Sequence, residues 1–411
     1  MSSSGLAGVG VITIPAEPLA SEGVAPEAIA PDPVDTAPED TALRTVESTT
    51  PSPSTVSPPR AQTPAASGPP ATPVSGAHSA AHPGTSTMAT DAADRAAAEL
   101  VASIPLAGSD TPLAQSLAVD TRRRLTLTGK PFPRPLHTRV MTVANQKGGV
   151  GKTTTTVNIA AALAQSGLAV LVLDLDPQGN ASTALGIDHH SDVPSIYDVL
   201  VEDKPLAEVV VPCATVPGLL CAPATIDLAG AEIELVSLVA REQRLARALQ
   251  VYLEQADVDY VLIDCPPSLG LLTINAFVAA SEVFIPIQCE YYALEGLSQL
   301  LKNVELVRKH LNPVLRVTTI LLTMYDGRTR LSSQVADEVR EHFPGEVLPT
   351  SIPRSVRVSE APSFGETVMT YDPVSSGALA YLEAASVIAA RGAATATGTT
   401  SSTNDSEQPR E

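Results

Sequence analysis

A glycine-rich segment near the middle of the chain, Lys147-Gly-Gly-Val-Gly-Lys-Thr-Thr154, limits the possible folds more than any other feature. It follows Arg139–Ala144, a short apolar run rich in β-branched residues that is typical of a buried strand. It also opens a helical pattern that extends to Ala164. A strand, a glycine-rich loop and a helix in this order form the phosphate-binding loop of many α/β proteins. The segment therefore predicts a nucleotide site.

Each residue type in this loop has a physical role in binding phosphate. Glycines allow the backbone N–H groups to curl around the phosphate oxygens, and the helix N-terminus adds partial positive charge. Lys152 is predicted to reach the β- and γ-phosphates, and the Thr153 hydroxyl is predicted to bind Mg²⁺. The other residues expected to surround the phosphates are Gly148, Gly149, Val150, Gly151 and Thr154.

Apolar runs of strand length alternate with longer helical patterns along the rest of this region. Strands are predicted at Leu168–Leu173, Tyr260–Ile263, Val283–Ile287 and Val317–Thr323. Helices are predicted at Glu232–Gln255, Leu271–Ala280, Tyr292–His310, Ser332–Phe343 and Ser376–Ala390. This alternation, with the right-handed crossover rule, predicts a doubly wound α/β domain with a mostly parallel sheet.

The composition divides the chain into three parts: a tail and linker at 1–137, an ordered α/β domain at 138–391, and a short tail at 392–411. The first part contains 20 of the 36 prolines, and its only aromatic residue is Phe132. Such a segment buries too little apolar surface to offset chain entropy, so we expect it to be disordered. Within it a short helix is possible at Asp91–Ser103. The run Arg122–Arg124 is interpreted as a solvated linker feature, with a DNA or partner contact as the alternative.

Charge and cysteine content exclude several classes of function. The formal net charge of −19 repels nucleic acid and anionic lipid, so DNA binding would require a local basic patch and would be sensitive to salt. The four cysteines form no C-x-x-C pair, which argues against zinc or iron–sulfur sites and favours buried thiols. The sequence shows no signal peptide and no long apolar span, so a cytoplasmic protein is expected.

Three aspartates at the ends of predicted strands are candidate catalytic or metal-binding residues. Asp176 lies just past its strand, where it is predicted to orient or polarise the attacking water. Asp174 lies two residues earlier and is expected either near the Mg²⁺ shell or as a residue that holds the loop. Asp264 ends the run Val261–Asp264 and is predicted to hold Mg²⁺ through water.

Four further motifs, in order, resemble the chromosomal ParA/Soj pattern over about Arg139 to Ala390. They are Asp176-Pro-Gln-Gly-Asn-Ala-Ser182, Asp264-Cys-Pro-Pro-Ser-Leu-Gly270, Glu290-Tyr-Tyr-Ala-Leu-Glu-Gly296 and the segment Pro353–Gly365. The loop itself has Gln146 where an ordinary Walker A motif has its first glycine, followed by the additional Lys147. This resembles the deviant Walker A (SIMIBI) class of P-loop NTPases, to which ParA and MinD belong. The long Pro/Ala-rich N-terminal segment resembles the tails of some actinobacterial members.

The resemblance implies an ATPase that binds ATP with Mg²⁺ and dimerises around the nucleotide. It implies that Lys147 reaches the nucleotide of the partner subunit, so that Lys147, Lys152 and Asp176 form the catalytic set. Family members read adenine near Pro353. Here Ser355 stands where the family often has asparagine, and its single hydroxyl replaces an amide.

The resemblance also implies nucleoid association, through binding of DNA without sequence preference, and a ParB-type centromere-binding partner that stimulates hydrolysis. The arginines of the family that contact DNA correspond to Arg328 and Arg357, and Arg330 and Arg354 are expected to assist. Dimerisation would bring both copies of these arginines together, which would produce a local basic patch despite the net charge.

Other functions were weighed against this one. A membrane-cycling ATPase similar to MinD would require a basic amphipathic helix at the C-terminus, whereas the chain ends in a Thr/Ser-rich segment. An iron–sulfur carrier would require a bridging cysteine pair. A polar scaffold, in which the N-terminal segment binds a cell-pole protein, remains open.

Overall fold

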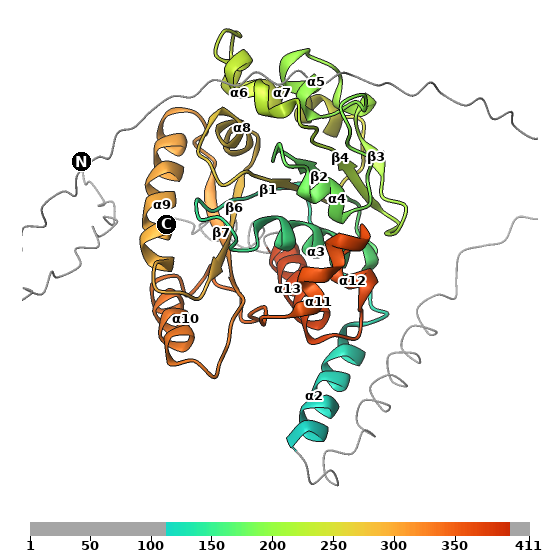
Figure 1. The fold of residues 1–411 in the computed structure, drawn as a ribbon, viewed down its shortest axis with the longest axis vertical. Coiled ribbons are helices and arrows are strands. Elements are labelled where there is room, and N and C mark those ends of the chain that lie inside the picture. The colour runs from blue at the N-terminus through green and yellow to red at the C-terminus, as the bar shows by residue number, and fades with distance from the viewer. Residues whose placement is uncertain (1–111, 395–411) are drawn as a thin grey trace, which may run out of the picture. The chain divides into compact units, whose positions relative to one another are not determined.

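The computed structural model describes residues 112–394 of the chain. The helix predicted at Asp91–Ser103 lies outside these residues. A single seven-stranded sheet organises the described part, with strand order β3-β4-β2-β5-β1-β6-β7 (Figure 1). The strands are β1 (Arg139–Val143), β2 (Val170–Asp174), β3 (Val211–Pro212), β4 (Leu219–Ala222), β5 (Tyr260–Asp264), β6 (Glu282–Gln288) and β7 (Arg316–Thr323).

All neighbouring strands are parallel except β3 and β4, which confirms the predicted mostly parallel sheet. The chain passes from β1 across β5 to β2, and later from β5 across β1 to β6. The direction of winding therefore changes beside β1 and β5. In doubly wound sheets, ligands bind at the carboxyl ends of the strands where this change occurs.

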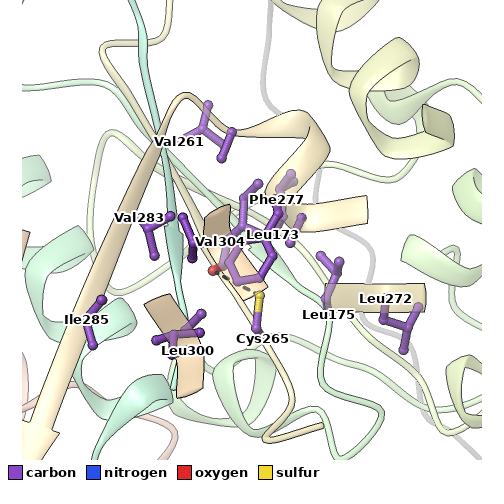
Figure 2. Packing of buried hydrophobic residues seen from close by; sticks show 14 of the residues in the cluster. Leu173, Leu175, Val261, Cys265, Leu272, Phe277, Val283, Ile285, Leu300 and Val304 are labelled. Carbon is purple, nitrogen blue, oxygen red and sulfur yellow. Dashed lines mark hydrogen bonds between the residues drawn. The ribbon is translucent and has the colours of Figure 1, made fainter. Parts of the chain in front are cut away.

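One face of the sheet is covered by the helices of the middle of the chain. Side chains of alternate residues, such as Leu173 of β2, Val261 of β5 and Ile285 of β6, point to this face, as Figure 2 shows. Phe277 and Leu300, from two covering helices, pack against them. The helices are α5 (Ile196–Val201), α6 (Leu228–Leu235), α7 (Arg244–Leu253), α8 (Leu271–Ala279), α9 (Ala293–His310) and α10 (Arg330–His342).

The opposite face is covered by the helix after the glycine-rich loop and by helices from the C-terminal part. Val172 of β2, Leu262 of β5 and Phe284 of β6 point to this face, one residue out of step with the first set. This alternation is the period of two expected for strands buried on both faces. The helices are α3 (Lys152–Gln165), α4 (Asn180–Ala184), α11 (Val356–Glu360), α12 (Val368–Tyr371) and α13 (Ser376–Ala394).

The predicted strands form within two residues of their expected ends, but two features of the middle region were not predicted. The short strands β3 and β4 extend the sheet at one edge. The helix predicted at Glu232–Gln255 is wrong in its length, because Ala240 is left-handed, with φ of 52°. Buried Asn275 of α8 donates to the carbonyl of Arg241 at 2.8 Å and accepts from the N–H of Leu245 at 3.2 Å, so tertiary hydrogen bonds restart the helix as α7.

The residues just before β1 also differ from the expectation of a disordered segment. Helix α2 (Pro112–Leu127) packs against α13 (Figure 1), and Phe132 is buried in the core. Arg123 pairs with Glu383 at 2.6 Å, and Arg124 donates to the carbonyls of Pro373, Val374 and Ser375. The interpretation of this arginine run as a solvated linker is therefore wrong. The expected domain start at 138 is too late, because α2 and Phe132 pack onto the fold.

Candidate functional site

The glycine-rich loop lies between β1 and α3, at the carboxyl edge of the sheet. Gly149 and Gly151 have φ of 74° and 87°, values that favour glycine, and Gly151 directly precedes α3. The Thr323 hydroxyl at the end of β7 donates to the carbonyl of Val150 at 2.8 Å and fixes the loop. A Cβ at Gly148 or Gly149 would meet no other atom within 4 Å, so these residues border open space. The loop thus has the predicted shape of a phosphate cradle.

Lys152 is buried at the start of α3, with an exposed fraction of 7%. Its ammonium group donates to the carbonyl of Lys147 at 3.5 Å. Burial lowers the pKa of Lys152, and the nearby Asp264 and Asp176 oppose that effect. A buried cation at the mouth of a phosphate cradle attracts an anion strongly, because water screens it little.

Asp264 ends β5 next to the loop and is completely buried. Its carboxylate accepts from the Thr153 hydroxyl at 2.7 Å and from the Thr156 hydroxyl at 2.9 Å. Burial, together with the neighbouring Asp174, raises the pKa of Asp264 to about 8. A hydroxyl and a carboxylate in contact, both with hard oxygen atoms, fit Mg²⁺, which is usually held by few protein groups together with phosphate and water.

Asp174 lies opposite Asp264 in the pairing of β2 with β5. Its oxygens accept hydrogen bonds from the backbone N–H of Asp176 at 3.1 Å, and from the N–H and hydroxyl of Ser182 at 2.9 and 2.8 Å. Burial raises the pKa of Asp174 to about 6, although these hydrogen bonds act in the opposite direction. Both oxygens are therefore engaged within the protein. Of the two roles predicted for Asp174, the geometry favours holding the loop over binding Mg²⁺.

A cleft of about 360 Å³ lies in front of the loop. Asp176 and Lys152 line it, as do Met324 and Pro362 from the segments after β7 and α11. Asp176 has an exposed fraction of 8%, and its carboxylate accepts from the N–H of Gln178 at 3.1 Å. The complete lining is Gly148, Gly149, Gly151, Lys152, Thr153, Thr154, Val157, Asp176, Asn180, Thr183, Ala184, Pro267, Met324 and Pro362.

The structure does not place Pro353 and Ser355 in the lining of this cleft, contrary to the expectation that they read the base. Pro353 lies beside α2 and α13, in a separate cavity of about 400 Å³. Ser355 precedes α11, and its side chain faces Gly377 of α13. From the C-terminal part of the described chain, the cleft is bordered instead by Met324 and Pro362. Met324 has φ of 50°, which is uncommon for methionine, but no sequence motif marks it.

Lys147 does not point into the cleft. Its ammonium group donates to the carboxylate of Glu290 at 2.8 Å, in the loop after β6. Its backbone N–H donates to the side chain of Asn145 at 3.0 Å, and Asn145 in turn donates to the carbonyl of Pro286 in β6. The additional lysine of the loop is therefore directed toward Glu290 and is not among the residues that line the cleft.

The predicted DNA-binding arginines lie in two segments that the fold brings side by side. Tyr325 and Pro353 form a parallel bridge, with the N–H of Tyr325 donating to Ile352 at 2.9 Å and the N–H of Arg354 donating to Tyr325 at 3.4 Å. Arg328 follows Tyr325, and its side chain is 91% exposed. Arg330 is the first residue of α10, and Arg357 lies in α11.

These arginines have acidic neighbours within the chain. Arg328 donates to Asp326 through two nitrogens, both at 2.9 Å. Arg357 pairs with Glu360 at 3.2 Å and with Asp372 at 3.4 Å. Exposed pairs of this kind are weak, so a phosphate can displace the carboxylates.

The residues around the cleft fit a nucleoside triphosphate with Mg²⁺. The glycine backbone and Lys152 would hold the phosphates, and Thr153 and Asp264 would hold the metal. Within residues 112–394 no group of three or more His, Cys, Asp or Glu side chains forms a metal cage, and the four cysteines are buried and free, as predicted. In the same part of the chain, no helix combines the length and apolarity needed to cross a bilayer.

Known proteins resemble this chain over the part that holds the cleft. The family model of the AAA domain matches residues 138–317. The chain is 54% identical over 254 residues to the sporulation initiation inhibitor protein Soj of Bacillus subtilis, covering 62% of this chain and 99% of Soj. It is 51% identical over 253 residues to the chromosome partitioning protein ParA of Caulobacter vibrioides, covering 62% and 94%.

A solved structure is similar as well. It is that of cobyrinic acid a,c-diamide synthase from Mycobacterium smegmatis with bound ATP analog and magnesium. It has a TM-score of 0.53 and 41% identity, and the match covers 61% of this chain and 94% of that one.

Proposed function

Because the chain belongs to the ParA/Soj family of P-loop ATPases, we propose that it partitions chromosomes or plasmids as an ATP-dependent, DNA-binding dimer. ATP hydrolysis and the use of ATP with Mg²⁺ belong to the family as a whole. Dimerisation, binding of DNA without sequence preference and stimulation by a ParB-type partner are the specific parts of the proposal. They would associate the protein with the nucleoid.

The observation that carries the proposal is the direct connection between the cleft wall and the arginine segments. Met324 borders the nucleotide cleft, and the next residue, Tyr325, pairs with Pro353. Arg328 and Arg354 follow these paired residues by three positions and by one. A nucleotide that changes the wall of the cleft therefore acts one residue away from the segments that would contact DNA.

In the proposed reaction, each residue of the cleft has one role. Mg²⁺ would neutralise charge on the phosphates. Lys152 and the loop N–H groups bind and orient the phosphates, while Thr153 and Asp264 hold the metal. Asp176 borders the cleft, and we assign it to orienting the attacking water. Asp174 positions Asp176 and Ser182 through its hydrogen bonds and does not take part in the chemistry.

Dimerisation explains how a chain with net charge −19 would bind DNA. Each copy contributes Arg328, Arg330, Arg354 and Arg357, so the dimer doubles the number of phosphate contacts. Since affinity for DNA depends steeply on the number of phosphates neutralised, a monomer would bind poorly. Lys147 would contact the nucleotide of the partner subunit, which makes the dimer dependent on ATP.

The decisive experiment measures binding of the full chain to a non-specific DNA duplex over a range of salt, with ATP and with ADP. We expect binding only with ATP, and a steep loss as salt rises. Arg357→Glu should weaken binding at low salt by at least about tenfold, because each dimer loses two phosphate contacts and gains two repulsions. The matched control is Arg308→Glu on α9, where Arg308 pairs with Glu305 at 2.8 Å as Arg357 does with Glu360.

Two results would contradict the proposal. One is equal binding with ATP and ADP. The other is an equal loss of affinity in Arg308→Glu and Arg357→Glu, which would reflect total charge and no defined surface. If no DNA binding occurs at low salt, association with lipid vesicles becomes the next measurement.

A further inference from the structure

The carboxylate of Glu290 lies between the lysine of the nucleotide loop and an arginine of the candidate DNA surface. One oxygen accepts from the Lys147 ammonium group at 2.8 Å. The other lies 3.9 Å from the guanidinium of Arg354 and accepts from the side-chain amide of Gln288. A single acidic group thus lies within ion-pair distance of two cations, and these belong to the two surfaces that the proposed function couples.

The loop that carries Glu290 is held in place through its backbone. The hydroxyl of Ser332, in the first turn of α10, donates to the carbonyl of Cys289 at 3.2 Å. That helix begins at Arg330. The carbonyl of Glu290 accepts from the N–H of Ala293 at 2.9 Å, which fixes Glu290 at the start of α9. The backbone is therefore held in place while the carboxylate can exchange partners.

The three side chains are exposed enough for such an exchange. The exposed fractions are 35% for Lys147, 45% for Glu290 and 67% for Arg354. Exposed ion pairs are weak, so a nucleotide phosphate can compete with Glu290 for Lys147. Lys152, in contrast, is buried and has no carboxylate partner within salt-bridge distance in the described residues.

We propose that Glu290 is a positioning residue that holds Lys147 and passes its carboxylate to Arg354 when Lys147 turns to a nucleotide phosphate. The proposal rests on the proposed function, because the phosphate in question is that of a partner subunit. Glu290 sets the ATP concentration at which the dimer forms, since the phosphate must displace it. Arg354 lowers that concentration, because it gives the released carboxylate a second cation.

The two roles predict effects of opposite sign on dimerisation. Glu290→Gln removes the competing charge and should lower the ATP concentration for half-maximal dimerisation by about two- to fivefold, the range in which exposed ion pairs act. Arg354→Ala should raise it by a similar factor in the wild-type background. In the Glu290→Gln background, Arg354→Ala should have no effect, because no carboxylate remains to be accepted.

The experiment measures sedimentation of the full chain against concentration of a non-hydrolysable ATP analogue with Mg²⁺. DNA is left out, so that any role of Arg354 in DNA binding does not contribute. The matched control is Glu295→Gln, the same change at an exposed carboxylate five residues along the chain. Thermal midpoints of all variants should agree, because every altered group is at least one-third exposed. A merely structural role would not give the non-additive double variant.

Distinct outcomes separate this inference from the proposed function. If Glu290→Gln dimerises at the wild-type ATP concentration, or if Arg354→Ala acts equally in both backgrounds, the positioning role is wrong while the partition function stands. If the wild-type chain remains monomeric at every concentration of the analogue, the proposed function fails and this inference fails with it.

Discussion

The nucleotide cleft and the arginine surface of this protein use charge in opposite ways. Lys152, Asp174 and Asp264 are buried, and each forms hydrogen bonds with the backbone or with hydroxyl groups. Arg328, Arg354 and Arg357 are exposed, and each lies within ion-pair distance of a carboxylate. Burial strengthens the electrostatic interactions of the first set, but it costs free energy of desolvation. Exposure makes the ion pairs of the second set weak, so that their partners can be exchanged.

This difference suggests how the two regions would divide the work in the proposed cycle of DNA binding and release. Chemistry on a phosphate requires groups whose positions do not change, so the protein accepts the cost of burying charges that oppose one another. Reversible binding to DNA requires contacts that salt and competing charges can break. We therefore expect single changes in the cleft to have large effects, and single changes on the arginine surface to have moderate ones.

The largest effect is expected from Lys152→Ala, which tests whether the buried cation is indispensable. Loss of one fixed donor to the transferred phosphate typically lowers turnover by at least about 100-fold. Phosphate release at saturating ATP and Mg²⁺ measures it, with Lys130→Ala as the control because Lys130 is exposed and lies outside the cleft lining. Turnover within threefold of wild type would mean that burial of Lys152 is only structural. The contrast between an indispensable buried charge and the exposed arginines would then be wrong.

The second effect follows from the buried carboxylate of Asp264, whose pKa is raised to about 8 mainly by burial. A carboxyl group whose pKa is raised on folding contributes stability that is full below its ordinary pKa. That contribution is lost as pH rises through the raised value. The wild-type chain should therefore lose stability between pH 5 and pH 8.5 relative to Asp264→Asn. The difference should be at least about 1.4 kcal/mol, equivalent to one pKa unit.

Urea unfolding without nucleotide and with a chelator measures this difference. The Asn side chain can still accept from one of the Thr153 and Thr156 hydroxyls through its oxygen and donate to the other through its amide. The same variant should lose ATPase activity, because it no longer provides a metal-binding carboxylate. Parallel stability curves for the two chains from pH 5 to pH 8.5 would show that Asp264 carries its charge without cost. The contrast between the two regions would then rest on exposure alone.

The cleft was largely predictable from the sequence because its positions follow from local backbone rules. A strand, glycines with positive φ and a helix place Lys152 and Thr153, and the end of a parallel strand places Asp264. Tertiary hydrogen bonds were not predictable in this way. Asn275 interrupts the helix expected at Glu232–Gln255, and no local pattern identifies a residue 30 positions away as its cap.

The arginine surface was predicted by resemblance, since exposed arginines have no local pattern that distinguishes them. The structure places Pro353 and Ser355 away from the cleft in which they were expected, because their segment turns toward α13. Met324 and Pro362 border the cleft. Helix α2 was missed because a proline-rich flank concealed it. Its docking depends on Arg123 and Glu383, which are 260 residues apart.

The smallest effect is expected at the arginine surface itself, from Asp326→Asn. Arg328 holds the pKa of Asp326 down to about 2 through paired hydrogen bonds, so Asp326 is charged under all ordinary conditions. Its removal takes a negative charge away from the proposed DNA contact at Arg328, so that DNA phosphates no longer compete with Asp326 for this arginine. The asparagine oxygen can still accept from the N–H of Arg328, which keeps the turn intact.

DNA affinity with ATP should therefore rise, by about two- to threefold at low salt, and the gain should shrink as salt increases. The control is Asp337→Asn on α10, which removes the same charge from an exposed pair with Arg340. A loss of affinity in Asp326→Asn would mean that the carboxylate orients Arg328 toward DNA. The arginines would then be held in place before DNA binds, as the residues of the cleft are before nucleotide binds. Weak, exchangeable ion pairs would no longer distinguish the arginine surface from the cleft.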